Sequence, residues 1–314
     1  MGFIEAANEI YVGNSEQWPF PIMEIPDRPP ALAISDLLFH KYELASIILQ
    51  KQSYLNTWIV EQAILRKADI VLLMIVDGLS YYDIKDDKRV IPVLVDGPTI
   101  TQFGYRNVVG SPHISRMLFQ AGYKQQRAFT YFSTDGDDLS GDIHEMFGTS
   151  QVSVVTEHGQ IIDKLMGDEL THGYVQIVSP GLDHLSHNHR DRPLKDEYVK
   201  NILSNFSRVV GTLGRSGKRV LGCLTADHGI LWRDSLLYPS EIVDVAVEDS
   251  YHPRYVKGTY RRDYTLTVDS FLGNYSLLKY PYLTRNLRRT EWGVHGGVSA
   301  WESLVPLVHV EMNC

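Results

Sequence analysis

The sequence has little cysteine, no long apolar run and no internal repeat. Only two cysteines occur among 314 residues, one inside the apolar run around Cys223 and the other at Cys314. We therefore expect no structural disulfide and a reducing, cytoplasmic setting. No apolar run approaches the roughly 18 residues that span a membrane, and the first residues, MGFIEAANEI, lack the basic and apolar regions of a signal peptide. We therefore expect no membrane partner.

An excess of positive charge is also lacking. The net charge is −8, so the whole molecule is not a polyanion binder, and any contact with nucleic acid needs a local basic patch. The hydrophobic content of 44% is ordinary for a globular protein. We interpret residues 1–314 as a single domain with a sizeable core, in which residues 1–68 form an N-terminal wrap followed by helices.

Four apolar runs are present, at residues 69–78, 127–133, 174–180 and 219–227. Each is bounded by charged residues, glycine or proline, which is typical of a strand buried on both faces. Apolar residues at helical spacing predict helices over residues 36–66 and over residues 198–213, the latter ending at Gly214 or Gly217. Strands that alternate with helices predict an α/β fold with a mainly parallel central sheet covered by helices on both faces.

Acidic residues and histidines lie at the ends of three of these runs, and His295 lies in a Gly-rich turn near the C-terminus. The carboxyl ends of parallel strands share one edge of a sheet, so we expect these side chains to meet there. One such residue alone is more often a helix cap or a turn residue than a ligand. The occurrence of several aspartates and histidines at such positions in one chain indicates a metal centre. Their oxygen and nitrogen donors suit two Zn²⁺ ions, with Mn²⁺ as the second choice. The candidate residues are Asp77, Asp183, His187, Asp227, His228 and His295.

The segment VDGPTITQFGYRNVVGSP, residues 95–112, supplies a candidate nucleophile. A short helix predicted to begin at Thr101 and to end near Gly110 places a hydroxyl at the positive end of the helix dipole. A metal ion bound to this hydroxyl would lower its pKa, in the way that metals activate bound water. The alternative is that Thr99 or Thr101 is only a helix N-cap.

The order Asp, Thr, Asp-x-x-x-His, Asp-His and His-Gly-Gly resembles the alkaline phosphatase superfamily. The resemblance implies a three-layer α/β sandwich with two metals at one sheet edge. PTITQFGYRNVVG is similar to the Pro-Thr-x-Thr segment of the phosphodiesterase branch, which implies that Thr101 is the nucleophile. The ligands implied for the first metal are Asp183, His187 and His295, and those for the second are Asp77, Asp227, His228 and Thr101.

Within that superfamily, VDGLSYYD, YHPRYVKG and HGGVSAWESLVPLV resemble segments of PglZ domains. This resemblance implies a metal-dependent phosphodiesterase acting on nucleotides or oligonucleotides through a phospho-threonine intermediate. It also implies a phage-defence system of the BREX type, with protein partners, and leaves the oligomeric state open. The run Asp77-Gly78-Leu79-Ser80 lacks the arginine of the Asp-Ala-Leu-Arg common in PglZ domains. The alternatives are a phosphomonoesterase and a metal-binding module without catalysis.

The interval 230–290 is interpreted as a basic, aromatic insertion near the site. Residues 252–290 hold eight basic and two acidic residues, with seven aromatic residues interleaved. Basic charge holds phosphates and aromatic faces stack bases, so this composition suits single-stranded nucleic acid or nucleotides. Arg254 is the residue expected to contact a phosphate. The alternative is an edge hairpin with solvated charges and tyrosines packed beneath it.

Overall fold

The computed structural model of the chain describes residues 30–84, 90–131, 138–167, 170–187, 189–215, 217–236, 241–244 and 252–312. The N-terminal wrap expected before the first helix lies outside the described residues. Among the described helices, none is both long and apolar enough to cross a membrane.

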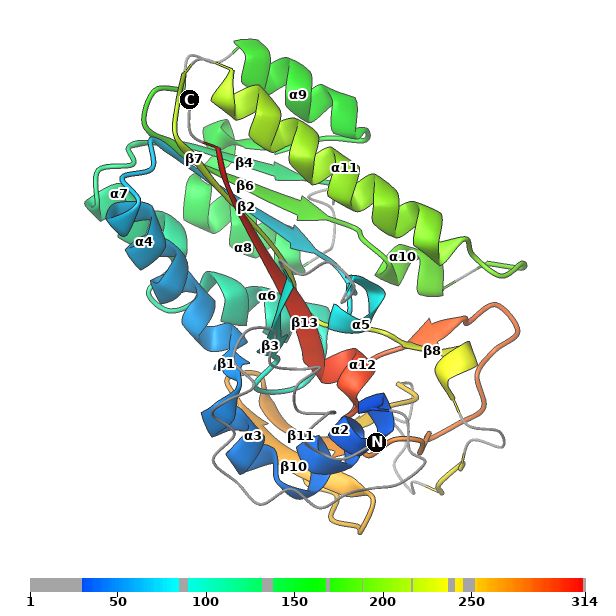
Figure 1. The fold of residues 1–314 in the computed structure, drawn as a ribbon. Coiled ribbons are helices and arrows are strands. Elements are labelled where there is room, and N and C mark those ends of the chain that lie inside the picture. Colours follow the sequence, from blue (N-terminus) through cyan, green and yellow to red (C-terminus); the bar gives the residue numbers. More distant parts are fainter. Residues whose placement is uncertain are drawn as a thin grey trace.

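An eight-stranded sheet forms the centre of the molecule, in the order β1-β3-β13-β7-β2-β6-β4-β5 (Figure 1). All neighbouring strands are parallel except β13, which runs antiparallel to both β3 and β7. The α/β class and the mainly parallel sheet are therefore confirmed. The strand bounds are β1 Gln50–Lys51, β2 Ile70–Val76, β3 Val90–Leu94, β4 Gln125–Thr130, β5 Val152–Val154, β6 Gly173–Ser179, β7 Val220–Ala226 and β13 Leu304–Met312.

Helices cover both faces of this sheet. Helices α9 and α11 lie on one face, and α4, α6, α7 and α8 lie on the other (Figure 1). The predicted amphipathic helix is α11, which buries Ile202, Phe206 and Val209 and ends at Gly214. The helical stretch expected over residues 36–66 is divided into α2, α3 and α4. The bounds are α2 Pro30–His40, α3 Tyr42–Ile48, α4 Leu55–Leu65, α6 Thr101–Val109, α7 Ile114–Gln120, α8 Asp138–Phe147, α9 His158–Gly167 and α11 Lys195–Gly214.

Two small sheets, three short α-helices and three 3-10 helices complete the part of the chain that the structure describes. The 3-10 helices are Gln52–Tyr54, Thr149–Gln151 and Arg233–Ser235. One sheet has the strand order β10-β11-β9 and the other pairs β12 with β8. Ser299 caps α12 by accepting a hydrogen bond from the Glu302 N–H. The bounds are α5 Tyr81–Ile84, α10 Asp183–Ser186, α12 Ala300–Ser303, β8 Leu231–Trp232, β9 Tyr255–Lys257, β10 Thr265–Ser270, β11 Gly273–Leu278 and β12 Gly293–Val294.

Candidate active site

Three aspartates lie at the carboxyl ends of three adjacent parallel strands. Asp77 follows β2, Asp227 follows β7, and Asp183 opens α10 a few residues after β6. In the sheet, β2 lies between β7 and β6, and its last residue, Val76, pairs with the last residue of each neighbour. The parallel register therefore delivers all three carboxylates to the same edge.

The six predicted ligand residues form two groups there. Within each group, one ligand atom from every residue lies within 4.8 Å of the others. The rings of His228 and His295, one from each group, stack with centroids 4.1 Å apart, so the two groups adjoin. We call them the histidine-rich trio, which is Asp183, His187 and His295, and the carboxylate-rich trio, which is Asp77, Asp227 and His228.

Backbone groups orient the carboxylate-rich trio. The N–H groups of Gly78 and His228 donate to Asp227 Oδ1 at 3.0 and 2.7 Å, which fixes the carboxylate and leaves Oδ2 for another partner. His228 Nδ1 donates to the Gly229 carbonyl oxygen at 3.1 Å. Its other nitrogen, Nε2, therefore carries the lone pair and lies 3.4 Å from Asp77 Oδ1.

The Thr101 hydroxyl lies against this trio. Its Oγ1 is 3.1 Å from His228 Nε2 and 3.5 Å from Asp77 Oδ1. Thr101 is the first residue of α6, while the N-cap is Ile100, which makes no capping bond through its side chain. The N-cap alternative for Thr101 is therefore wrong, and its hydroxyl faces the ligand groups instead.

Thr99, which the sequence left as an alternative cap, anchors the turn that carries His295. Its Oγ1 donates to the Gly297 carbonyl oxygen at 3.0 Å and accepts from the Gly296 N–H at 2.9 Å. Its carbonyl oxygen accepts from His295 Nδ1 at 2.9 Å, so Nε2 faces Asp183 Oδ1 at 3.5 Å. His187 Nε2 lies 3.3 Å from the same oxygen. The two threonines of the Pro-Thr-x-Thr segment therefore contact different trios. Thr101 lies against the carboxylate-rich trio, and Thr99 bonds to His295 of the histidine-rich trio.

Two further residues hold the end of β7 in place, and no sequence pattern singled them out. The buried amide of Gln52 donates to the carbonyl oxygens of Ala226 and Asp227 at 2.8 and 2.7 Å. Helix α6 packs so closely that a Cβ on Gly104 would lie 2.0 Å from the Asp227 carbonyl oxygen. Helix α6 can lie this close to the end of β7 only because Gly104 has no side chain.

Burial and mutual repulsion dominate the electrostatics of the site. Burial raises the pKa of Asp77 well above its ordinary value, and the charges of Asp227 and Asp183 raise it further. Burial also raises the pKa of Asp227 to about 7 and lowers the pKa of His228 to about 3. Buried carboxylates that repel one another are stabilised by a cation between them. The mixed carboxylate and imidazole donors fit divalent cations such as Zn²⁺.

Asp183 differs from the other two carboxylates because histidines surround it. Burial raises its pKa, but the hydrogen bond from His187 and the nearby His295 and His228 outweigh burial and leave the pKa below its ordinary value. The same contact raises the pKa of His187. The histidine-rich trio therefore holds an ionised carboxylate at its centre.

Arg254 has a structural role that replaces the expected phosphate contact. Its side chain is fully buried, and Nε and Nη2 donate to the Glu302 carboxylate at 3.0 and 2.8 Å. Nη2 also donates to the Leu278 carbonyl oxygen at 3.0 Å, and Nη1 donates to the Lys279 carbonyl oxygen at 3.2 Å. The buried carboxylate of Glu302 requires a cationic partner, and Arg254 supplies it.

Much of the basic, aromatic stretch is likewise structural. Tyr255 and Tyr275 are buried and pack against each other with ring centroids 5.6 Å apart, so they offer no face to a base. Lys279 pairs with Asp36 at 3.2 Å. The expectation of an open aromatic platform is wrong for these tyrosines, which follow the edge-hairpin alternative.

Three other histidines, His113, His184 and His189, are not candidate ligands. His113 caps α7, because its Nδ1 accepts a hydrogen bond from the Ser115 N–H at 3.1 Å. His184 and His189 contact each other edge to face, with centroids 5.9 Å apart. None of the three belongs to either trio.

Comparison of the structure with solved structures identifies the fold. It resembles phosphonoacetate hydrolase from Sinorhizobium meliloti with a TM-score of 0.51 at 10% identity, over 77% of this chain and 90% of that one. Murine ectonucleotide pyrophosphatase/phosphodiesterase 5 gives a TM-score of 0.45 at 11% identity, over 76% and 87% of the two chains. No protein-family model and no curated protein matches the sequence. At these identities the likeness shows the fold alone, an α/β fold like that of phosphonoacetate hydrolase.

Proposed function

We propose that this alkaline-phosphatase-like chain is a two-metal phosphodiesterase that acts on nucleotides or oligonucleotides. One observation carries the proposal: the Thr101 hydroxyl lies 3.1 Å from His228 Nε2, beside two adjoining trios of ligand residues. A hydroxyl, a helix N-terminus and two sets of candidate metal ligands therefore lie close together. The Pro-Thr-x-Thr resemblance favours a diester as the substrate.

Each trio would hold one divalent cation, and Zn²⁺ fits the mixed nitrogen and oxygen donors better than Mn²⁺. When bound, two such ions stabilise negative charge on the phosphoryl oxygens and favour ionisation of an oxygen ligand. The carbonyl oxygens of Gly229 and Thr99 accept hydrogen bonds from His228 Nδ1 and His295 Nδ1, which keeps both imidazoles in the tautomer whose Nε2 can bind a metal.

Thr101 would act as the nucleophile. After losing its proton, Oγ1 attacks the phosphorus in line with the leaving oxygen, which departs with the electrons of the broken P–O bond. Water then attacks the phosphorus, the bond to Thr101 breaks, and the hydroxyl recovers a proton. Because Thr101 is the first residue of α6, the positive end of the helix dipole stabilises the negative charge on Oγ1.

The biological setting is part of the proposal and rests on the PglZ-like segments. They suggest a phage-defence role with protein partners from the same system. The fold does not select the substrate, since one fold supports many reactions. The structural neighbour in complex with phosphonoacetate is, by its name, a phosphonoacetate hydrolase.

Turnover of bis-p-nitrophenyl phosphate by protein loaded with Zn²⁺ or Mn²⁺ tests the proposal. We expect activity in the wild type and a loss of at least about a thousandfold in Thr101→Ala, because the nucleophile is removed. Thr101→Ser keeps a hydroxyl and should retain much of the rate. Equal turnover by wild type and Thr101→Ala would show that Thr101 is not the nucleophile.

A further inference from the structure

A cavity of about 300 Å³ opens directly beside the histidine-rich trio. Two members of that trio, His187 and His295, form part of its wall. The rest of the wall includes His252, Arg285, Arg288 and Glu291. Any substrate whose phosphorus reaches Thr101 therefore has this cavity as a neighbour.

The charges in this wall do not cancel. Arg285 donates to both oxygens of Glu291, each at 2.8 Å, and this pair is internally neutral. These bonds lower the pKa of Glu291 to about 2, so its carboxylate is ionised at neutral pH. The guanidinium of Arg288 is exposed and makes no hydrogen bond or ion pair with the part of the chain that the structure describes. Arg288 therefore gives the wall a net positive charge.

The loop backbone keeps Arg288 at this position. Its N–H donates to Glu291 Oε2 at 2.6 Å, and its carbonyl oxygen accepts a hydrogen bond from the Arg233 guanidinium. Glu291 is in turn bound to Arg285. The Cα of Arg288 is thus held on both sides while its side chain keeps its donors for a ligand.

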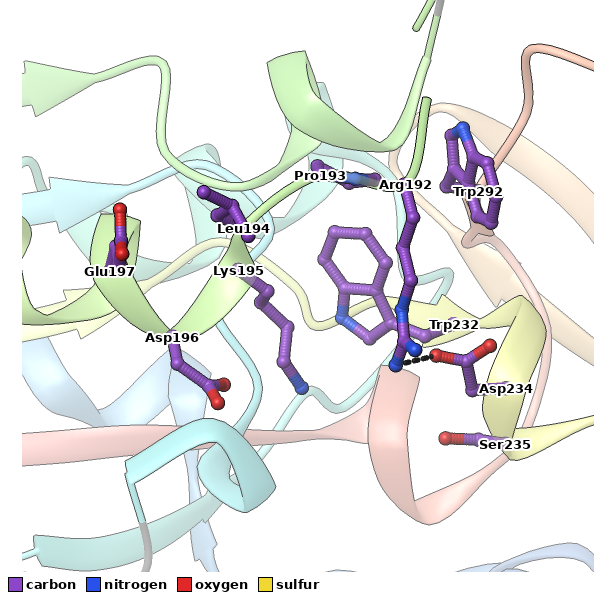
Figure 2. A pocket seen from close by; sticks show the side chains of 10 residues that line it. All are labelled: Arg192, Pro193, Leu194, Lys195, Asp196, Glu197, Trp232, Asp234, Ser235 and Trp292. Carbon is purple, nitrogen blue, oxygen red and sulfur yellow. Dashed lines mark ion pairs between the residues drawn. The ribbon is translucent and has the colours of Figure 1, made fainter. Parts of the chain in front are cut away.

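A larger cavity nearby, of about 600 Å³, has the opposite character (Figure 2). Arg192 reaches across the Trp232 ring to pair with Asp234, and Lys195 pairs with Asp83 at 2.8 Å. With both cations paired, Asp196 and Glu197 leave this wall negative. A phosphate is repelled there, so the smaller cavity is the anion site of the two.

We propose that the smaller cavity binds a second phosphate group of the substrate, beside the phosphate ester that is cleaved, with Arg288 as the main contact and His252 as an additional donor. A guanidinium fork matches the oxygens of a phosphate. His252 is held in place by stacking on Tyr255, with ring centroids 4.3 Å apart. The inference rests on the proposed function and narrows its substrates to esters that carry a further phosphate.

The test compares substrates with and without that phosphate. The dinucleotides TpT and pTpT form the oligonucleotide arm, and the p-nitrophenyl ester of thymidine 5′-monophosphate and thymidine 5′-triphosphate form the polyphosphate arm. We expect Arg288→Ala to raise KM about ten- to a hundredfold for pTpT, for the triphosphate or for both, because a charge-assisted hydrogen bond is lost. The two substrates without a second phosphate should be unaffected. The arm that responds identifies the source of the phosphate.

Arg289→Ala is the matched control, because Arg289 is the adjacent exposed arginine and is absent from the cavity wall. It should leave every KM unchanged. Equal effects of the two variants, or an equal effect of Arg288→Ala on substrates with and without the second phosphate, would overturn the inference. Loss of the proposed function itself would appear separately, as absent turnover in the wild type. Equilibrium binding of pTpT against TpT would then give the same comparison.

Discussion

Asp227 accepts two backbone N–H groups at one carboxylate oxygen and keeps the other oxygen for a different partner. One of these donors, Gly78, follows β2, which neighbours β7 in the sheet although Gly78 and Asp227 are 149 residues apart in the chain. Gly78 has φ +73°, and a Cβ there would lie 2.9 Å from the Asp183 backbone nitrogen. At the residue scale, the ligand geometry therefore depends on the backbone of neighbouring strand ends as much as on the ligands.

His113 provides a pH-dependent prediction outside the active site. Burial lowers its pKa to about 4, against 6.5 for an ordinary histidine. The unfolded chain then binds this proton more readily, so stability falls as the pH drops from about 6.5 to about 4. We expect His113→Asn, which retains a capping side chain, to reduce this loss of unfolding free energy by about 1–3 kcal/mol. Urea unfolding at about pH 6.5 and about pH 4 measures the difference.

The exposed His172 provides the control for this measurement. His172→Asn should leave the difference in unfolding free energy between the two pH values as it is in the wild type. An acid sensitivity that is the same in His113→Asn and in the wild type would contradict the assignment of a buried, neutral imidazole at the start of α7.

At the scale of elements, the approach of α6 to the end of β7 positions Thr101, the proposed nucleophile. Gly104→Ala would place a methyl group 2.0 Å from the Asp227 carbonyl oxygen, so the helix must shift. We expect a loss of about 1–3 kcal/mol in stability and weaker metal binding, measured by urea unfolding and metal titration.

Gly211→Ala is the matched control, because Gly211 lies inside α11 and a Cβ there meets no atom within 4 Å. This substitution should instead raise the unfolding free energy by about 0.5–1 kcal/mol, since alanine is the better helix former. If both variants gained stability, the close contact between α6 and Asp227 would be refuted.

Arg254 and Glu302 tie β9 and the end of β11 to α12. Both side chains are fully buried, so removal of one leaves an unpaired buried charge. We expect Arg254→Ala to lower the unfolding free energy by about 3–5 kcal/mol. Arg261→Ala, at an exposed position of the same basic stretch, should change it by less than about 0.5 kcal/mol. A stable Arg254→Ala variant with weaker substrate binding would restore the phosphate-contact interpretation.

At the scale of the whole molecule, local patterns predicted the buried parallel strands and two helices. These are α6, which begins at Thr101, and α11, which covers one face of the sheet. The patterns missed β3, a short strand interrupted by Pro92, whose partner Pro306 lies on β13. The sequence also gave no sign that β13 enters the sheet antiparallel between β3 and β7. Such pairings join residues that are distant in sequence, so a local pattern does not carry them.

The same limit on local sequence patterns applies to the candidate site. The three aspartates were accessible from the sequence because they follow parallel strands that share one edge. His295 follows β12, which lies in a separate sheet, and its place in a trio was implied by the superfamily resemblance. The contacts of Gln52 and the pairing of Arg254 with Glu302 were not accessible from the sequence, because the partners lie far apart in the chain. Charge counting alone placed Arg254 among the substrate contacts, and only its burial shows that its donors are used within the fold.

Metal removal tests the trios as parts of the folded molecule. Cations that bind only the native state stabilise it, by about 2.7 kcal/mol at a hundredfold excess over the dissociation constant. We expect dialysis against a chelator to lower Tm and added Zn²⁺ to restore it, with two ions bound per chain in elemental analysis. Asp183→Asn should reduce the bound metal toward one ion. A Tm unaffected by chelator and by Zn²⁺, with no bound metal, would favour a module without catalysis.

The central claim is that Thr101 becomes covalently bonded to the phosphorus of the substrate. Acid quenching of metal-loaded protein during turnover of bis-p-nitrophenyl phosphate, followed by peptide mass spectrometry, tests it most directly. The account predicts that the peptide containing Thr101 gains the mass of one p-nitrophenyl phosphoryl group, and that Thr101→Ala shows no such adduct. Rapid turnover without an adduct on Thr101, or with the adduct on another residue, would contradict it.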